Sequence, residues 1–292
     1  MTGNDFITLD GGRLTVARAF AATLEASGLR TFADVMAHAS KTVMRSVPGR
    51  STVRVELKRP DGGVQVAYLK RYEPRYLSPG KRLLRRMGWA VAQDEAGHEW
   101  QAILDLQSAG FLTAAPIAFG QQKEAGLVTS SFLLTADITG GVPGDDYCRT
   151  LKAAERWKLA REVAALARKF HVAGFVHKDF YFSHIFVVEQ GKQRILRMID
   201  LQRVVHPLPV LRSRWIVKDL AALGYTAQRA GATFADLMRF YLVYAGKQQL
   251  EAADRRLIAR VMKRIQHLHR RGPKYDVIWD QPGARPDVPN KR

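Results

Sequence analysis

The chain has 292 residues, which at about 150 residues per domain allows two folding units or one large bilobal domain. Hydrophobic residues make up 47% and charged residues 25%, which excludes wholesale disorder and collagen-like sequence. Forty-six Lys and Arg against 27 Asp and Glu leave a net charge of +19, so we expect a polyanionic partner: nucleic acid, an anionic membrane face or a phosphorylated substrate. The single cysteine, Cys148, excludes an internal disulfide and is compatible with a reducing, cytoplasmic compartment.

The first half of the chain predicts an antiparallel sheet with one main helix, assigned to residues 46–139 and preceded by a helical extension at 1–45. Residues 1–10 lack the apolar core of a secretory signal, so we expect none. Pro60-Asp61-Gly62-Gly63 between two alternating segments predicts a hairpin. The predicted elements are two short helices within Leu14–Ser40, strands at 52–58 and 64–70, a helix at 95–109, and strands at 115–119, 126–130 and 132–135.

The second half, residues 140–280, predicts a mainly helical lobe that begins after a glycine-rich linker. Leu159, Val163, Leu166 and Phe170 recur at helical spacing, which predicts a helix at 154–173. Two short strands at 184–188 and 195–199 follow, and then helices to about residue 269. Residues 281–292 hold three prolines and few apolar residues, so we expect a disordered tail. No uncharged run reaches the ~18–20 apolar residues that a membrane span needs.

The stretch Gly174 to Val188 carries the most chemistry, because it places His177, Asp179 and His184 in a loop between a helix and a strand. A second acid, Asp200, follows the next predicted strand. Phosphoryl transfer needs one carboxylate to hold the attacking hydroxyl and another to bind Mg²⁺ on the phosphates. Two acids suffice because catalysis is mainly positioning and charge neutralisation.

H-K-D at 177–179, followed by His184, resembles the catalytic-loop pattern H-R-D-x-x-x-x-N of the protein-kinase-like fold. I-D-L at 199–201 stands where D-F-G would. Together with R-W-I-V-K-D-L-A at 214–221, these motifs are similar to the bacterial lipopolysaccharide core kinase (Kdo/WaaP) family, over residues 50–223. The resemblance implies an α+β fold that is bilobal and protein-kinase-like, with an antiparallel sheet N-lobe and a mainly helical C-lobe.

The resemblance also implies roles for single residues. Asp179 would orient the acceptor hydroxyl or act as general base, and Asp200 would bind Mg²⁺. Lys70, at a strand end, would hold the ATP phosphates and pair with Glu99 on the next helix. We prefer Glu99 to Glu95, one turn earlier, because the residues beside Glu99 mark the packed helix face. The alternative for Lys70 is that it only opens the basic run after the strand.

The other residues expected to contact the nucleotide stand where the sequence departs from the kinase pattern or follows a strand. No G-x-G-x-x-G precedes the first predicted strand, so we expect Arg50 or Ser51 to contact the nucleotide instead. Tyr68 replaces a small residue and would reshape the adenine pocket, and the backbone around Thr135, from 134 to 137, would bind the adenine.

Two histidines and one further acid complete the expected site. His177 belongs to the catalytic loop and is expected to hold it by hydrogen bonds. His184 replaces a metal-binding asparagine; imidazole is a poor Mg²⁺ ligand, so its metal role stays open beside a phosphate-site role. Asp219 is expected to accept backbone N–H bonds from the catalytic loop.

Two basic clusters suggest a surface for anionic lipid. Residues 70–86 hold seven basic residues and one acid, and 255–274 hold eight basic residues and no acid, on a helix with an apolar stripe. The alternative for the second cluster is a core-packed helix with a solvated basic side.

We therefore predict a cytoplasmic ATP- and Mg²⁺-dependent kinase, peripheral on the inner membrane, that phosphorylates a heptose or Kdo hydroxyl of a lipopolysaccharide precursor. The alternatives are a small-molecule or protein kinase, and a non-catalytic membrane-associated pseudokinase. A nucleic-acid-binding module is disfavoured because no zinc motif or RNA-recognition signature is present.

Overall fold

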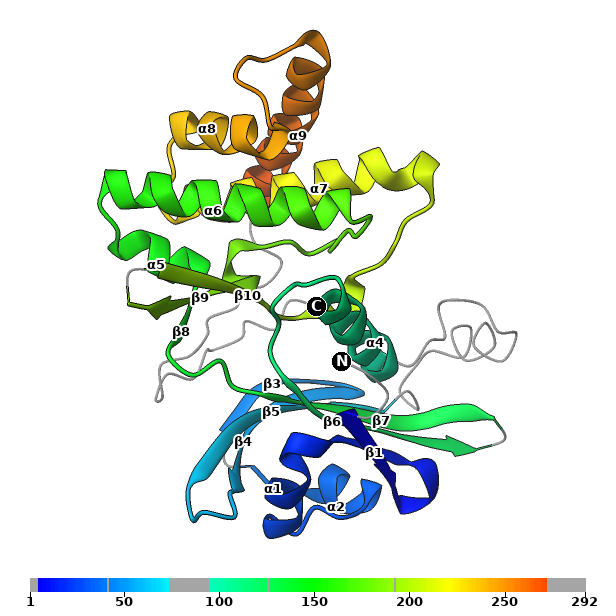
Figure 1. Cartoon of the computed structure of the whole chain (residues 1–292). Coiled ribbons are helices and arrows are strands. Elements are labelled where there is room, and N and C mark those ends of the chain that lie inside the picture. Colours follow the sequence, from blue (N-terminus) through cyan, green and yellow to red (C-terminus); the bar gives the residue numbers. More distant parts are fainter. Residues whose placement is uncertain (1–4, 41, 74–94, 125, 192, 272–292) are drawn as a thin grey trace.

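A computed structural model describes residues 5–40, 42–73, 95–124, 126–191 and 193–271, which form a sheet lobe and a helical lobe (Figure 1). The sheet lobe holds a seven-stranded sheet in the order β1-β2-β6-β7-β5-β4-β3, in which every pair of neighbours is antiparallel. The expected α+β architecture, with an antiparallel sheet lobe and a mainly helical lobe, is confirmed. The elements of this lobe are β1 (Phe6–Leu9), β2 (Leu14–Ala17), α1 (Ala21–Ala26), α2 (Phe32–Ala37), β3 (Thr42–Val47), β4 (Arg50–Lys58), β5 (Val64–Tyr72), α4 (Glu95–Ser108), β6 (Pro116–Glu124) and β7 (Leu127–Ala136).

The predicted hairpin forms strands β4 and β5, with a continuous register from Arg50 opposite Tyr72 to Lys58 opposite Val64. Alternate residues Val53, Val55 and Leu57 of β4 point into the core and are at most 5% exposed, because successive side chains of a strand point to opposite faces. This pairing carries Lys70, near the end of β5, to the side of the sheet that faces α4.

The structure corrects the prediction for the start of the chain. Two short helices, α1 and α2, lie within Leu14–Ser40 as expected, but Leu14 and Val16 lie on strand β2, both fully buried. Strand β2 pairs with β6, and β3 crosses the expected boundary at residue 45, so residues 5–45 belong to the sheet lobe and are not a separate helical extension. The error arose because Val16, Phe20 and Leu24 lie four residues apart, a spacing that falls on one face of a strand as well as on one face of a helix. The two strand runs expected at 126–130 and 132–135 are one strand, β7.

Helix α4 lies between the sheet and the helical lobe (Figure 1). Its Trp100 packs against Phe6 and Phe119, with ring centroids 5.1 and 5.8 Å away, which anchors the helix on the sheet. The buried face expected beside Glu99 is confirmed, since Glu99, Trp100 and Ile103 are all at most 7% exposed. The helix therefore holds a glutamate inside the boundary between the two lobes.

The helical lobe begins with a small sheet in the order β10-β9-β8 and continues with five helices in the described residues up to 271. Its elements are β8 (Gly141–Pro143), α5 (Gly144–Thr150), α6 (Ala153–Val172), β9 (Ile185–Gln190), β10 (Gln193–Met198), α7 (Pro209–Arg229), α8 (Phe234–Ala245) and α9 (Ala252–Arg271). Antiparallel pairing of β9 with β10 brings the end of β10, and hence Asp200, back beside His184.

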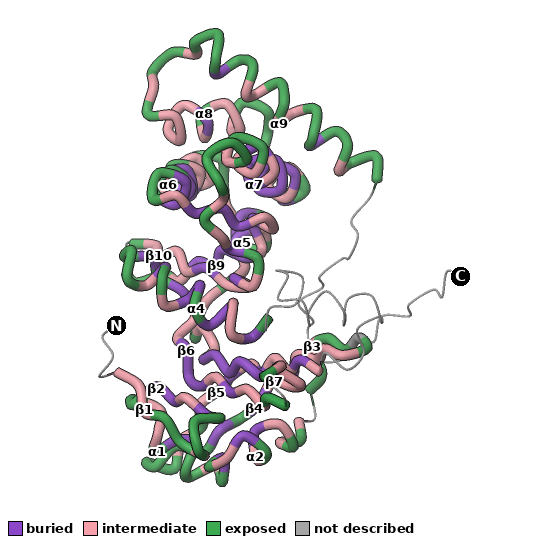
Figure 2. The backbone as a smooth tube through the Cα atoms, turned by 90° about the vertical axis from the view of Figure 1, so that its right-hand side faces the viewer, coloured by how far each residue is buried: buried purple, intermediate pink, exposed green. Residues whose placement is uncertain are grey.

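Helix α9 buries its apolar stripe within the protein. Ile265 is 2% exposed and packs with Val261 and Leu268 against α7, whereas the basic side of the helix is exposed (Figure 2). The structure shows the core-packed helix with a solvated basic side, and attraction of that side to anionic lipid stays a prediction. The expected tail, residues 281–292, lies outside the described residues. The other basic segment, residues 70–86, is described only as far as residue 73. No helix in the described part of the chain is long and apolar enough to span a membrane.

Candidate active site

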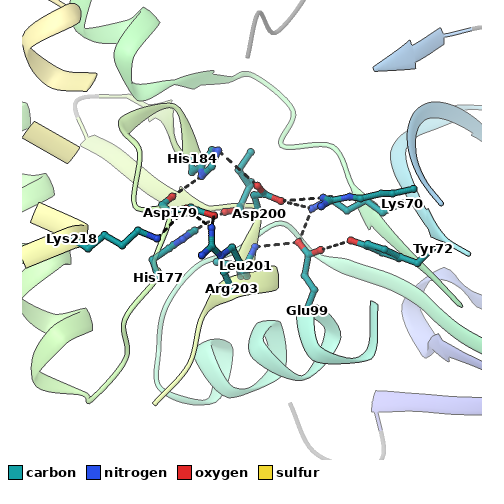
Figure 3. A network of polar contacts seen from close by, with 12 residues as sticks. Lys70, Tyr72, Glu99, His177, Asp179, His184, Asp200, Leu201, Arg203 and Lys218 are labelled. Atoms are coloured by element: carbon teal, nitrogen blue, oxygen red, sulfur yellow. Dashed lines mark hydrogen bonds and ion pairs between the residues drawn. The ribbon is translucent and has the colours of Figure 1, made fainter. Parts of the chain in front are cut away.

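The ion pair predicted between Lys70 and Glu99 is confirmed, with Lys70 Nζ 2.7 Å from Glu99 Oε1 (Figure 3). Glu99 is 2% exposed, and the same Oε1 accepts the backbone N–H of Leu201 at 3.1 Å. Its Oε2 lies 3.5 Å from the hydroxyl of Tyr72. Glu95, the competing partner, is instead 4.0 Å from Arg50. Glu99 therefore ties the sheet, helix α4 and the segment after β10 together.

Asp200 completes this cluster from the helical lobe. It follows β10 in a left-handed backbone conformation, with φ 55° and ψ 52°, and Lys70 Nζ lies 2.9 Å from its Oδ1. Burial opposes ionisation, but Lys70, His184 and Arg50 outweigh it and hold the pKa of Asp200 well below its usual range. Burial likewise opposes the charge on Lys70, and Asp200 and Glu99 reverse the effect and raise the pKa of the lysine. Both groups are therefore charged at neutral pH.

Arg50 lies where the missing glycine loop would be. Its guanidinium is 3.9 Å from Asp200 Oδ1 and stands over the ring of Tyr72 at 5.2 Å. Arg50 starts β4 and is opposite Tyr72 in the register, so the sheet itself aims the side chain into the cluster.

Asp219 anchors the loop that carries His177, Lys178 and Asp179, as expected. Its side chain is fully buried and accepts the backbone N–H of His177 at 2.7 Å and that of Lys178 at 2.8 Å. These bonds hold Lys178 at a φ of 65°, in the left-handed region that a residue with a Cβ rarely adopts. Helix α7, which carries Asp219, thus fixes the loop and with it the position of Asp179.

The two loop histidines stack on each other, with ring centroids 5.8 Å apart. His184 Nδ1 lies 2.9 Å from the backbone oxygen of Asp179, and because a carbonyl only accepts, this nitrogen carries the proton. His184 Nε2 then faces Asp200 Oδ2 at 3.9 Å. Burial and the neighbouring His184 lower the pKa of His177, which is wholly buried and packs on Phe180, so it acts as a neutral support for the loop.

Two cations that the sequence analysis gave no role contact Asp179. Arg203 Nη1 lies 2.9 and 2.8 Å from its two carboxylate oxygens, and Lys218 Nζ lies 3.6 Å from Oδ1 (Figure 3). Arg203 follows Asp200 by one short 3₁₀ turn, and Lys218 immediately precedes Asp219. These fixed offsets from predicted site residues were the signal that could have found them.

Tyr68 and Thr135 lie directly opposite each other on β5 and β7, one strand repeat from Lys70. Burial, with Asp137 next, raises the pKa of Tyr68, so its hydroxyl stays protonated and able to donate. Within the backbone expected to bind adenine, residues 134–137, the N–H groups of Ala136 and Asp137 already donate to the oxygens of Ala115 and Val66 at 2.8 and 3.0 Å, so these two donors are occupied.

The donor set fits Mg²⁺ held jointly with a nucleotide. Asp200 supplies a carboxylate of the kind that Mg²⁺ prefers, and Arg50 and Lys70 beside it supply charge for phosphate oxygens. Among the described residues, no group of three or more His, Cys, Asp and Glu side chains could hold a metal alone. An ion here would take its other ligands from phosphates and water, as Mg²⁺ commonly does.

A sheet lobe whose strand lysine pairs with a helix glutamate, set against a loop aspartate of a helical lobe, defines the protein-kinase-like fold. Within this fold the chain belongs to the lipopolysaccharide kinase (Kdo/WaaP) family, whose model matches residues 35–244.

Three similar proteins carry related descriptions. The lipopolysaccharide core heptose(I) kinase WaaP of Escherichia coli K12 is 35% identical over 161 residues, which cover 52% of this chain and 60% of that protein. The protein of the same name from Pseudomonas aeruginosa PAO1 is 29% identical over 192 residues, covering 62% and 71%. A solved structure, "WaaP in complex with acyl carrier protein", has a TM-score of 0.66 and 26% identity, covering 88% of this chain and 99% of that one. The match thus spans about 60% of the length of the E. coli relatives.

Proposed function

We propose that this protein is an ATP- and Mg²⁺-dependent kinase that phosphorylates a heptose hydroxyl of a lipopolysaccharide core precursor. The observation that carries the proposal is the junction of Lys70, Glu99 and Asp200 at the boundary of the two lobes, with Asp179 on the anchored loop beside it. Phosphoryl transfer requires such a junction, because cations must neutralise the phosphates where a carboxylate can orient the attacking hydroxyl.

In this proposal each residue has one task. Lys70, held by Glu99, binds the phosphates, and Arg50 supplies the charge that a glycine loop would supply through its backbone. Mg²⁺, when bound to Asp200, would neutralise charge on the transferred group. Asp179 accepts the hydroxyl proton, which requires that its oxygens exchange Arg203 for the acceptor. The adenine would use the carbonyls of 136–137 and the amides from Ile138 onward, beside Tyr68 and Thr135.

Heptose is favoured over Kdo as the acceptor because the relatives from both organisms are named heptose(I) kinases. The glycolipid acceptor would bring the enzyme to the cytoplasmic membrane face. The exposed basic side of α9, which includes Arg256, Arg260 and Arg264, supports attraction to an anionic surface at about 1 kcal/mol per residue.

We also propose that acyl carrier protein binds this chain, as the name of the solved relative states for that protein. An apolar pocket between helices α6, α7, α8 and α9, lined among others by Leu223, Phe240 and Val261, has the chemistry that an acyl chain needs. Purification with and without co-expressed acyl carrier protein tests this point: a stable complex is expected, and two separate peaks on gel filtration would contradict it.

Deletion of the gene in its own cell, followed by phosphate analysis of purified lipopolysaccharide, tests the main proposal. Core phosphate is expected to disappear, to return with the wild-type gene and not to return with Asp179→Ala. Unchanged phosphate after deletion contradicts the proposed acceptor. Nucleotide binding without turnover on heptose, small-molecule or protein acceptors would favour a pseudokinase.

A further inference from the structure

Three cations, Lys178, Arg203 and Lys218, lie near Asp179, and together they outnumber the carboxylates that contact them. Arg203 and Lys218 contact Asp179, and Lys178 Nζ instead faces the ring of Trp215 at 4.8 Å. Lys218 Nζ lies over the same ring at 5.5 Å. Lys178 forms no ion pair with any carboxylate among the described residues. We name Lys178, Arg203, Lys218 and the Trp215 ring the cation cluster.

The other nearby acid cannot neutralise the cluster by direct contact. Asp219 is fully buried and uses one oxygen for the backbone N–H of His177 and the other for that of Lys178. Burial is the main reason that the pKa values of Lys178 and Lys218 are lowered, and repulsion from Arg203 lowers both further. Burial and mutual repulsion disfavour the positive charges of Lys178 and Lys218, so a bound anion would stabilise these charges.

The donors of the cluster are partly unused. Arg203 spends only Nη1 on Asp179, so within the described residues its Nη2 and Nε make no hydrogen bond. The Arg203 side chain is 48% exposed, whereas those of Asp179 and Lys218 are 20% and 22% exposed. A ligand can therefore reach the guanidinium and the ammonium groups from solvent.

The backbone adds a second, independent observation. Lys178 is one of three non-glycine residues with a positive φ in the described chain, and another, Asp200, is a proposed metal ligand. Such conformations cost about 1–3 kcal/mol and persist where the surrounding structure enforces them. Here the residue with the strained backbone is the one whose side chain faces the ring of Trp215.

We propose that the cation cluster is an acceptor subsite for an anionic group, a carboxylate or a phosphate, carried by the saccharide next to the hydroxyl that receives the phosphoryl group. This inference rests on the proposed kinase function. When the acceptor binds, Arg203 moves its charge from Asp179 to the acceptor anion, which frees both carboxylate oxygens for the hydroxyl. The bound anion thus both positions the acceptor and unmasks the base.

The competing role for the same cations is contact with the transferred phosphate of ATP. That role predicts a fall in kcat with every acceptor, neutral or charged. The acceptor subsite predicts a rise in the acceptor KM that disappears when the acceptor is neutral. Kinetics with matched acceptors therefore separate the two.

The experiment uses Lys178→Gln and Lys218→Gln in the full chain, with Lys158→Gln as the control. Lys158 is an exposed lysine on α6 that pairs with Glu155, so its loss removes one charge away from the cluster. Acceptors are a heptose-containing saccharide with its carboxylate free or methyl-esterified, and with a phosphate present or removed. Loss of a charged hydrogen bond predicts about a tenfold or larger rise in the KM of the anionic acceptor, with the ATP KM unchanged.

Wild-type enzyme is expected to lose a similar factor when the responsible anion is masked, and the two acceptor series show whether it is the carboxylate or the phosphate. Equal kcat/KM for masked and free acceptors overturns the subsite while the kinase function stands. Calorimetric binding of the same saccharides without nucleotide tests the subsite even if no turnover occurs. Equal affinity of free and masked saccharides there contradicts it, and absence of transfer with selective binding contradicts only the kinase function.

Discussion

The two sides of the site differ in how they are built. On the nucleotide side, Lys70, Glu99 and Asp200 form a set of charges with defined partners, in which Glu99 is buried and Lys70 and Asp200 are half-buried. On the acceptor side, Asp179 meets Arg203 and Lys218 in a half-open cluster with spare donors. A nucleotide presents the same phosphates to every kinase, so its side can be rigid and general. In the proposed function the acceptor side would recognise one saccharide, and the spare donors there would be available for that ligand.

The largest expected effect tests the acceptor side. Asp179→Asn keeps the shape of the loop but removes the proton acceptor, so kcat is expected to fall by about 10²–10⁴-fold. Nucleotide affinity is expected to stay unchanged, because Asp179 does not belong to the Lys70 cluster. Steady-state kinetics and nucleotide titration measure the two quantities. Loss of nucleotide binding would show that the two sides are not separable.

Glu99→Gln breaks the nucleotide side. It leaves Lys70 with one carboxylate instead of two, and removal of one partner of a buried pair typically destabilises a protein by about 3–5 kcal/mol. Thermal unfolding is expected to show a clear loss of stability, and turnover is expected to fall. Glu95→Gln on the same helix is the matched control; its side chain is 60% exposed, so we expect a stability change within about 0.5 kcal/mol. Equal effects of the two variants would contradict the assigned ion pair.

Asp219→Ala tests the support under the acceptor side. It leaves two backbone N–H groups unsatisfied, at about 1–3 kcal/mol each if they stay buried, and it releases the strained Lys178. We expect lower stability and lower kcat in the folded variant, with partial recovery in Asp219→Asn, which retains one acceptor oxygen. Wild-type turnover by folded Asp219→Ala would disprove the anchoring role.

The smallest expected effect concerns the stability contribution of Asp254, which lies outside both the nucleotide side and the acceptor side of the site. Asp254 accepts hydrogen bonds from Lys247, the Glu251 backbone and Tyr241, and the first of these contributes most to lowering its pKa to about 2. A carboxylate with a depressed folded-state pKa stabilises the protein above its unfolded pKa of about 3.9, and that contribution is lost as the pH falls toward 2. In denaturant titrations between pH 5 and 2, wild type is therefore expected to lose more stability than Asp254→Asn. Parallel curves would contradict the lowered pKa, and kinetics at neutral pH should not change.

The nucleotide side could be predicted from sequence because each residue lies on or directly after a recognisable element. Lys70 lies near the end of an alternating strand, Glu99 lies on the packed face of a helix, and Asp200 follows a short strand. The strand periodicity and the helix stripe are local signals, and they also predicted the hairpin and helix α6.

The remaining features depend on contacts between distant segments. Arg203 meets Asp179 only because β9 and β10 fold back and α7 holds the loop, and no periodicity records that. Strand β2 was misread as a helix because only its pairing with β6, about 100 residues later, decides its conformation. The sequence also could not decide between the two roles of α9, because its apolar face is buried only through contact with α7, a separate segment of the chain.

The most direct test of the central claim is transfer of phosphate from γ-labelled ATP to a purified heptose-containing core saccharide by the full chain. The account predicts label in the saccharide that requires Mg²⁺ and is lost with Lys70→Met, Asp200→Asn and Asp179→Asn alike. Transfer that persists in all three variants, or a wild-type protein that binds ATP but labels no saccharide, would contradict it.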